Sequence, residues 1–283
     1  MIQPQVFEFN NETGTDNAYM TNCTRSNYLA QFTSYKDQLT SKGIEVLHWQ
    51  NPDPNAKDSI FANNWFTTIS PPDVQYPTLI LCSMRHSSRR LERQPIFVQE
   101  LASMYPNIID LTLFENQGLY LEGTGSMVID RKQHKIFMSL SERSSEQVLD
   151  YLIQEINKIS QFVWKKVVFE AKDLNGKCIY HTNIVLALTD QEAIINLDCF
   201  GDGDRVKVVE ELGEYEIVRI SQDDSKNFVG NVEVLECSGE VVAFVSQRAR
   251  GRLQLKCKME FVDICDIEDI GGGSTQCMLG KLF

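Results

Sequence analysis

The alternation of apolar and polar positions predicts a chain of short strands with amphipathic helices between them. The clearest helix is expected over residues 144–159, where a serine can cap the first turn and apolar side chains recur at helical spacing. Those apolar positions are Val148, Leu149, Leu152, Ile153 and Ile156. Around this helix we expect a strand interrupted by two glycines, a polar turn and two further strands, at residues 118–129, 131–134, 135–140 and 166–171.

The same order of elements recurs further along the chain. Strands are expected at 179–188 and 192–197, a helix at 205–212 and a strand at 215–220; two more strands, at 232–237 and 241–246, are joined by a Ser-Gly turn. A strand–strand–helix–strand unit of roughly 50 residues suggests a propeller of equivalent blades. An ordinary α/β sandwich is the alternative.

Composition limits the class of protein and its partners but does not indicate a function. The chain has 283 residues, of which 42% are hydrophobic and 23% charged, so it can bury a core without disulfides or a metal. No low-complexity linker divides it, which favours a single domain over residues 1–283. The net charge of -12 argues against nucleic acid as a partner.

Targeting signals and cysteine usage favour a cytoplasmic protein. Residues 1–10 lack a basic segment followed by an apolar core, and no apolar run approaches the ~20 residues of a membrane span. None of the eight cysteines forms a C-x-x-C pair, and in a reducing compartment most would be small buried hydrophobes. Neither a metal nor a cofactor is expected.

Two segments in the first half of the chain carry candidate chemistry. Residues 58–65 hold Asp58 and the adjacent amides Asn63 and Asn64; such a pair forms a turn and offers donors and acceptors at one point. In the segment LEGTGS, Glu122 stands in an apolar strand before two glycines, which often mark close approach by a ligand or by backbone. A polar turn and a solvated glutamate are the plain alternatives.

Two segments in the second half add a base and a nucleophile. In YHTN, Asn183 lies two residues after His181, so in a strand the two share a face. In GGGSTQCM, Cys277 follows three glycines, and backbone N–H groups of such a loop favour a thiolate. Alone, either is explained by a core histidine or a flexible tail.

The four segments in this order resemble the amidinotransferase, or guanidino-modifying, superfamily with the pentein fold. The resemblance is to the branch of arginine-deiminase-related proteins and citrulline ureidases, which carries F-x-NNW, LEGTGS followed by Asp-Arg, YHTN and GGGS-x-x-CM. The early residues 11–17 and the basic segment 89–93 also match, so the resemblance spans nearly the whole chain. It implies an α/β fold, a five-bladed α/β propeller of strand–strand–helix–strand units.

The resemblance also implies roles for individual residues. Cys277 matches the nucleophile, His181 the general acid/base and Glu122 the carboxylate that orients or charges the histidine. Asp58 matches a contact to the nitrogen-bearing end of the substrate, and the pair Arg89 and Arg90 matches a segment that can hold a substrate carboxylate. A thiolate and a histidine suit a poorly electrophilic guanidinium or ureido carbon, because attack needs a strong nucleophile and the leaving amine needs a proton. We expect Cys277, His181 and Glu122 to converge on one pocket.

The sequence departs from arginine deiminases where these place aspartates against the guanidinium. Asn64 and Asn183 stand there instead, and an amide can both donate to and accept from a neutral ureido group. We therefore expect hydrolysis of citrulline to ornithine, carbon dioxide and ammonia. Gln276 stands where the branch has Arg and Lys281 where it has an acid, which bears on the substrate more than on the reaction class.

Two alternatives are kept. One is a deiminase or a dimethylarginine-type hydrolase that acts on a guanidinium with the same residues. The other is a non-catalytic binding protein of the same fold, against which Cys277, His181 and Glu122 argue jointly. In each case the partner is a small molecule, with neither nucleic acid nor membrane involved, and a homo-oligomer is left open.

Overall fold

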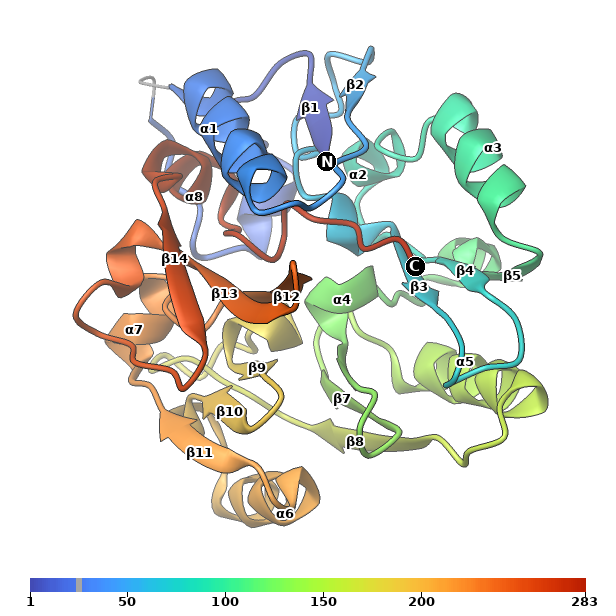
Figure 1. Cartoon of the computed structure of the whole chain (residues 1–283), viewed down its shortest axis with the longest axis vertical. Coiled ribbons are helices and arrows are strands. Elements are labelled where there is room, and N and C mark those ends of the chain that lie inside the picture. Colours follow the sequence, from blue (N-terminus) through green and yellow to red (C-terminus); the bar gives the residue numbers. More distant parts are fainter. Residues whose placement is uncertain (24–26) are drawn as a thin grey trace. The chain divides into compact units, whose positions relative to one another are not determined.

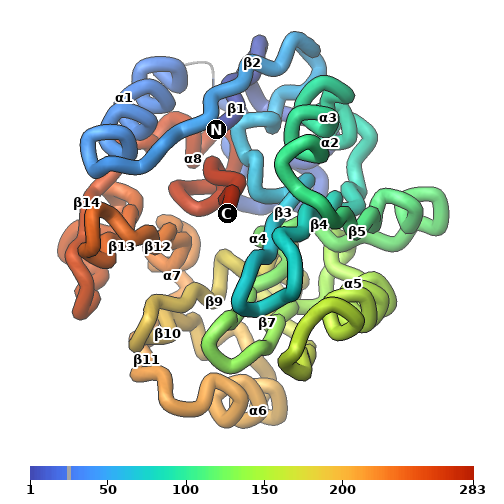
Figure 2. The backbone as a smooth tube through the Cα atoms, turned by 45° about the vertical axis from the view of Figure 1, so that its right-hand side comes forward, coloured from blue at the N-terminus to red at the C-terminus, as the bar shows by residue number. Residues whose placement is uncertain are grey.

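The computed structural model of the protein describes residues 1–23 and 27–283 (Figure 1). The chain divides into two compact units, and each unit is assembled from segments that lie far apart in the sequence (Figure 2). Unit 1 comprises Met1–Ala62, Ile184–Asp198 and Glu214–Leu279. Unit 2 comprises Asn63–Asn183, Cys199–Gly213 and Gly280–Phe283.

The strands of the described residues form one two-stranded sheet and four three-stranded sheets. In unit 1 the sheets are β1 (Ile2–Pro4) with β2 (Trp49–Asn51); β9 (Leu186–Leu188), β10 (Glu192–Ile195) and β11 (Glu216–Arg219); and β12 (Glu233–Cys237), β13 (Glu240–Ser246) and β14 (Lys258–Val262). In unit 2 they are β3 (Phe66–Ile69), β4 (Thr78–Leu81) and β5 (Asn107–Asp110); and β6 (Val128–Asp130), β7 (Lys135–Ser139) and β8 (Lys165–Phe169).

All four three-stranded sheets share one connectivity. The first strand pairs antiparallel with the second, and the second, in the centre, pairs parallel with the third. A parallel pair needs a crossover, and the chain supplies an α-helix before the third strand in three cases and a 3-10 turn in the fourth. The predicted strand–strand–helix–strand repeat is thereby confirmed as an order of elements.

Helices make up most of the remaining regular structure. The α-helices are α1 (Tyr28–Ser41), α2 (Ser87–Arg90), α3 (Pro95–Met104), α4 (Gly123–Ser126), α5 (Glu146–Ile159), α6 (Asp202–Leu212), α7 (Gln222–Lys226) and α8 (Cys265–Gly271). The 3-10 turns are η1 (Thr13–Thr15), η2 (Ala62–Asn64), η3 (Thr112–Gln117), η4 (Thr182–Ile184), η5 (Leu197–Cys199) and η6 (Gln247–Ala249). No helix within residues 1–23 and 27–283 is both long and apolar enough to cross a bilayer.

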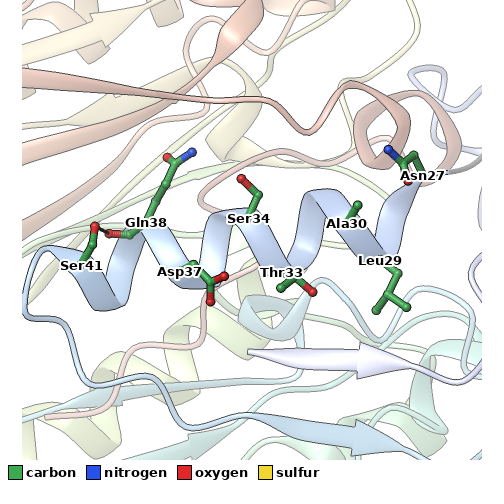
Figure 3. A pocket seen from close by; sticks show the side chains of 8 residues that line it. All are labelled: Asn27, Leu29, Ala30, Thr33, Ser34, Asp37, Gln38 and Ser41. Atoms are coloured by element: carbon green, nitrogen blue, oxygen red, sulfur yellow. Dashed lines mark hydrogen bonds between the residues drawn. The ribbon is translucent and has the colours of Figure 1, made fainter.

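Unit 1 buries one face of α1 against α8 and the β12–β14 sheet. Phe32, Tyr35 and Leu39 follow helical spacing and are fully buried, as expected for a helix with one apolar stripe. Its opposite face carries mostly small and polar side chains around a shallow hollow (Figure 3). The buried face of α1 therefore contributes to the same core as Cys277.

Unit 2 contains the helix that the sequence predicts most clearly. The apolar stripe of α5, which includes Leu149 and Leu152, packs on Ile136 and Met138 of the central strand β7 and on Trp164. The centre of β7, Ile136 to Met138, is apolar because both faces of the strand are buried. The predictions of a strand at 135–140, a helix at 144–159 and a strand at 166–171 are confirmed within one or two residues at most ends.

Two predicted strands are wrong over most of their length, and only their last two or three residues are in a strand. Over residues 118–129 the chain forms the turn α4 and only then the short strand β6, and Gly118 and Gly123 take positive φ values of 69° and 44°. Over 179–188 it forms η4 before β9, because the Thr182 hydroxyl accepts from the N–H of Ser139 at 2.8 Å and donates to the carbonyl of Ser126 at 2.5 Å. Side-chain bonds to backbone replace ladder bonds in both segments.

Candidate active site

Glu122 and His181 form a buried pair in unit 2. Nε2 of His181 lies 2.8 Å from Oε2 of Glu122, and both residues are buried. Glu122 lies directly before α4 and His181 directly before η4, so the two turns that replace the predicted strands position the pair. The other oxygen of Glu122 accepts the N–H of Arg85 at 3.0 Å, and Nη1 of Arg143 is 3.5 Å from Oε2. The carboxylate is thus held at both oxygens.

The electrostatics of the pair favour a charged glutamate and a neutral histidine. Burial disfavours the Glu122 carboxylate, but the Arg143 guanidinium and His181 outweigh burial and hold the pKa of Glu122 well below its usual range. Burial lowers the pKa of His181 to about 4 against the opposing effect of Glu122. Because an ionised carboxylate only accepts hydrogen bonds, neutral His181 carries its proton on Nε2 and keeps Nδ1 as a base.

The glycines of LEGTGS mark a close approach of chain segments, as predicted. A Cβ atom on Gly123 would lie 1.9 Å from the carbonyl oxygen of Asn63. A Cβ atom on Gly125 would lie 2.3 Å from Oδ1 of Asn64 and 2.6 Å from Nδ1 of His181. The two asparagines and the histidine therefore lie against the backbone of α4, and only glycine leaves room for them.

Three asparagines of unit 2 near this pair in sequence or in space are buried polar residues. Asn63 is 1% exposed, and neither atom of its amide makes a hydrogen bond to the described residues. Asn64 and Asn183 are buried too. A buried amide without a partner is unfavourable in the isolated protein, and a ligand with polar atoms would satisfy it.

We expect Gly125→Ala to destabilise the protein by about 1–3 kcal/mol, because the added methyl group overpacks the site. It should also lower turnover by displacing the His181 ring. Gly203→Ala is the matched control, since a Cβ atom there meets nothing within 4 Å and the position lies in α6. The free energy of unfolding of that variant should rise by no more than about 1 kcal/mol. Thermal melts and steady-state rates of both variants check this, and equal activities would contradict the close approach.

Cys277 lies in unit 1. Each of the three glycines before it is required by a different structural constraint. Gly272 caps α8 with φ of 65°, and its N–H donates to the carbonyl of Glu268 at 2.8 Å. Cβ atoms on Gly271 and Gly273 would lie 2.5 and 2.8 Å from the ring of Phe61. Cys277 is 5% exposed. The segment is therefore packed against its unit and is no flexible tail.

The sulfur of Cys277 contacts Asn231, a residue that the sequence analysis missed. Nδ2 of Asn231 lies 3.5 Å and Oδ1 3.6 Å from the sulfur. Oδ1 also accepts the N–H of Gln276 at 3.2 Å. The sequence offers only a Gly-Asn pair before a strand, which is typical of a turn.

A second buried carboxylate, Glu268, lies behind the glycine segment. Its Oε1 accepts the hydroxyl of Ser274 at 2.5 Å, and its Oε2 lies 3.2 Å from Nε of Arg248. Burial raises the pKa of Glu268 to about 7, against the opposing effects of Ser274, Ser246 and Arg248. Glu268 is thus connected to Cys277 through the turn in which Met278 N–H donates to the Ser274 carbonyl at 3.3 Å.

This shift predicts a loss of stability as the pH rises. The pKa of Glu268 is higher in the folded chain than its usual 4.5, so its contribution is complete below pH 4.5 and is lost as the pH rises through about 7. The slope approaches about 1.4 kcal/mol per pH unit in that window. We expect Glu268→Gln to remove this pH dependence. The free energy of unfolding of the variant should therefore rise relative to that of the unmutated protein between pH 5 and 8. Urea unfolding at several pH values measures this, and parallel curves would rule it out.

The remaining predicted residues are placed as follows. Asp58 is buried in unit 1, where its Oδ2 accepts from Nδ2 of Asn10 at 2.9 Å and from the hydroxyl of Thr13 at 2.8 Å. In unit 2, Arg89 is buried against Glu92, with Nη2 3.1 Å from Oε2. Arg90 donates to the carbonyls of Met84 and Arg85 at 2.9 and 3.1 Å. A substrate carboxylate at either arginine would compete with these partners, and this role stays a prediction.

The structure thus gathers Glu122, His181, Asn63 and Asn64 in unit 2, while Cys277 and Asp58 belong to unit 1. The predicted convergence of the cysteine with the histidine and the glutamate stays a prediction. No group of three His, Cys, Asp or Glu side chains in the described part of the chain could hold a metal ion.

Solved structures confirm an α/β fold that this chain shares with arginine-modifying enzymes. The N-terminal domain of ArgZ covalently bound to a reaction intermediate matches 98% of this chain and 94% of that one, with a TM-score of 0.77 at 15% identity. Apo ArgZ, an arginine dihydrolase from the ornithine-ammonia cycle in cyanobacteria, matches with a TM-score of 0.76 at 15% identity; the match covers 98% of this chain but 39% of that one. This chain therefore spans about two fifths of the full-length enzyme.

A third structure is a dimethylarginine dimethylaminohydrolase adduct with 4-chloro-2-hydroxymethylpyridine. It matches with a TM-score of 0.69 at 15% identity over 98% of this chain and 96% of that one. Comparison with curated proteins gave no match. Likenesses at this identity define the fold rather than the substrate.

The family is defined by the sequence. A family model described as N,N dimethylarginine dimethylhydrolase, eukaryotic, matches residues 3–283. The fold and this match place the protein in the pentein, or amidinotransferase, superfamily, in an arginine-modifying branch whose enzymes are hydrolases acting on carbon–nitrogen bonds. Within that class, the chain belongs to the N,N-dimethylarginine dimethylhydrolase family.

Proposed function

We propose that the protein is a cysteine-dependent hydrolase of the guanidino or ureido carbon of an arginine-derived small molecule. The observation that carries the proposal is the buried Glu122–His181 pair, held at 2.8 Å beside the side-chain amide of Asn64. A charged glutamate that fixes a neutral histidine is suited to proton transfer at neutral pH. The family match supports the reaction class. The single-domain, five-bladed propeller that the resemblance implies is part of this proposal.

The proposed reaction starts when the proton of the Cys277 thiol passes to His181. The resulting thiolate attacks the central carbon of the substrate, and a carbon–sulfur bond forms. The carbon–nitrogen bond to the leaving amine then breaks, and His181 gives that amine a proton. The same histidine next takes a proton from water, whose oxygen attacks the carbon and releases the thiolate. Glu122 stabilises the imidazolium that exists before the amine leaves and again after water loses its proton, because the charge of Glu122 is retained throughout.

We propose citrulline as the preferred substrate. The charge of Glu122 is already balanced by Arg143, with a smaller contribution from Arg89, and the neutral side chain of Asn64 lies beside His181. A guanidinium is bound best by a carboxylate that is not already paired with another cation. A ureido oxygen, in contrast, accepts hydrogen bonds from neutral amides. The structure with a covalent intermediate belongs to an enzyme that acts on arginine, and supports the covalent route more than the choice of substrate.

A methylated arginine is the second candidate, and the family match favours it. Buried Asp58 in unit 1 is the anion that could serve a guanidinium. Incubation of the protein with citrulline, arginine, dimethylarginine and agmatine, followed by amino-acid and ammonia analysis, tests the proposal. Release of ornithine, citrulline or an amine from one of them supports a hydrolase. Turnover of none, with tight binding of one, would favour a non-catalytic protein of this fold.

A further inference from the structure

Asn231 occupies a distinctive place beside the proposed nucleophile. It lies between α7 and β12, and it is 1% exposed. Its side chain offers both amide atoms to the sulfur of Cys277, with Nδ2 at 3.5 Å and Oδ1 at 3.6 Å. All of these residues belong to unit 1, so the arrangement is complete within one compact part of the molecule.

The orientation of this amide is fixed by its surroundings. The N–H of Gln276 points at the amide at 3.2 Å, and because a backbone N–H only donates, the atom that meets it is Oδ1. The main chain of Asn231 is anchored as well, since its carbonyl accepts the hydroxyl of Thr275 at 2.8 Å. The amide nitrogen is left to face the sulfur.

The two forms of Cys277 use this amide differently. A neutral thiol can donate its S–H to Oδ1, which is a weak bond. A thiolate cannot donate but accepts from Nδ2–H, and a hydrogen bond with one charged partner is about twice as strong as a neutral one. The site is buried, so water cannot replace this donor cheaply. The hydrogen bond from Nδ2 therefore opposes the penalty that burial places on the charged form of the sulfur.

We infer that Asn231 is a further catalytic residue, which donates a hydrogen bond from Nδ2 to the thiolate of Cys277. The inference rests on the proposed role of Cys277 as nucleophile and adds the group that holds the sulfur in its reactive form. The competing explanation is that Asn231 only anchors the glycine segment, through Oδ1 to Gln276 and through its carbonyl to Thr275.

Asn231→Ala, which removes the donor, is compared with Thr275→Val, which removes an anchor, and this comparison separates the two explanations. Asn231→Asp has nearly the same shape as asparagine and checks that position 231 faces the sulfur. It keeps an oxygen for the N–H of Gln276 but replaces the donor that faces the sulfur with an acceptor that carries negative charge. We measure the rate at which iodoacetamide alkylates Cys277 from pH 5 to 10 in the full chain, by mass spectrometry of the Cys277 peptide. The exposed Cys178 is the internal control.

The pH midpoint of Cys277 alkylation should rise by roughly 1–3 units in Asn231→Asp, because a carboxylate near the sulfur opposes the thiolate. In Asn231→Ala it should rise by at least about half a unit. The midpoint of Cys178 should not change. Thr275→Val, which removes an anchor without touching the sulfur, should lower the melting temperature and leave the Cys277 midpoint unchanged.

An unchanged Cys277 midpoint in Asn231→Ala, or an equal shift in Thr275→Val, overturns the inference and leaves the anchoring role. If Asn231→Ala does not fold, an unchanged Cys277 midpoint in the isosteric Asn231→Asp overturns the inference, because the side chain then does not face the sulfur. The assay needs no substrate, so it also separates this inference from the proposed function. Should Cys277 prove dispensable for turnover, the proposed function fails, and the alkylation profiles still show whether Asn231 stabilises the thiolate.

Discussion

Replacement of Cys277 by serine is expected to lower turnover at least about a thousandfold while leaving the fold intact. A serine hydroxyl is hardly ionised at neutral pH, and a guanidino or ureido carbon is too poor an electrophile for a neutral hydroxyl. The residue is 5% exposed and serine is slightly smaller, so packing changes little. The hydroxyl can still use both amide atoms of Asn231. The variant should therefore bind substrate, which calorimetry measures.

A matched control exists in the same core cluster. Cys237 is also 5% exposed and lies at the end of β12, away from the glycine segment. Cys237→Ser buries the same hydroxyl and should lower the melting temperature by a similar amount, but it should keep turnover within about twofold of the unmutated protein. Wild-type-like turnover by Cys277→Ser, or equal loss in both variants, would exclude the thiolate mechanism.

Local patterns predicted the elements whose structure is decided locally. The helix α5 has an apolar stripe over 14 residues and Ser145 before its first turn. The hairpin β12–β13 was readable because Ser238 and Gly239 both take positive φ, 53° and 84°, as a tight turn requires. The order strand, strand, helix, strand in β6–β8 and in β9–β11 also followed from this repeat. Periodicity was sufficient here because neighbouring residues pack on one face.

The strands were predicted wrongly where contacts with residues distant in sequence determine the backbone conformation. Residues near Gly123 look like an interrupted strand, but the carbonyl of Asn63, 60 positions away in sequence, leaves no space for a side chain there. The segment of His181 was assigned to a strand from its apolar neighbours, whereas Thr182 bonds to Ser126 and Ser139 and holds a turn. The proposed shared face of His181 and Asn183 therefore lost its basis, although both remain beside each other in the turn. Long-range contacts of this kind leave no local pattern.

The candidate site shows the same division. Glu122, His181 and Cys277 stand in motifs that a family resemblance can identify, and the first two are indeed paired. Arg143, which keeps Glu122 ionised, is 21 positions away from it, and Asn231 is 46 positions from Cys277. A buried arginine and a buried asparagine have no distinctive sequence context, so only the folded chain shows their partners.

The second large effect concerns the charge of the substrate. We expect the unmutated protein to turn over citrulline faster than arginine, and the double variant Asn64→Asp with Asn183→Asp to shift this preference toward arginine. A carboxylate that meets a cation in a buried site contributes roughly 1.5–3 kcal/mol. Two such contacts would change the ratio of rates by about two to four orders of magnitude.

Asn64 also acts through its neighbour. Its Oδ1 lies on the same side of α4 as Nδ1 of His181, since both approach the position of a Cβ atom on Gly125 within 2.6 Å. A carboxylate at position 64 would therefore favour the protonated ring and raise the pKa of His181 from its low value of about 4. The pH profile of the double variant should move upward on its acidic side.

Asn196→Asp is the control for this substitution. Asn196 is fully buried in unit 1 and donates to the hydroxyl of Ser225 at 2.8 Å, so the change should reduce stability and leave the ratio of substrates as it was. Ornithine formed from citrulline and citrulline formed from arginine are measured for all three proteins. If the unmutated protein makes citrulline from arginine at least as fast as ornithine from citrulline, the neutral amides do not select the substrate. The guanidinium alternative that the family match favours would then stand.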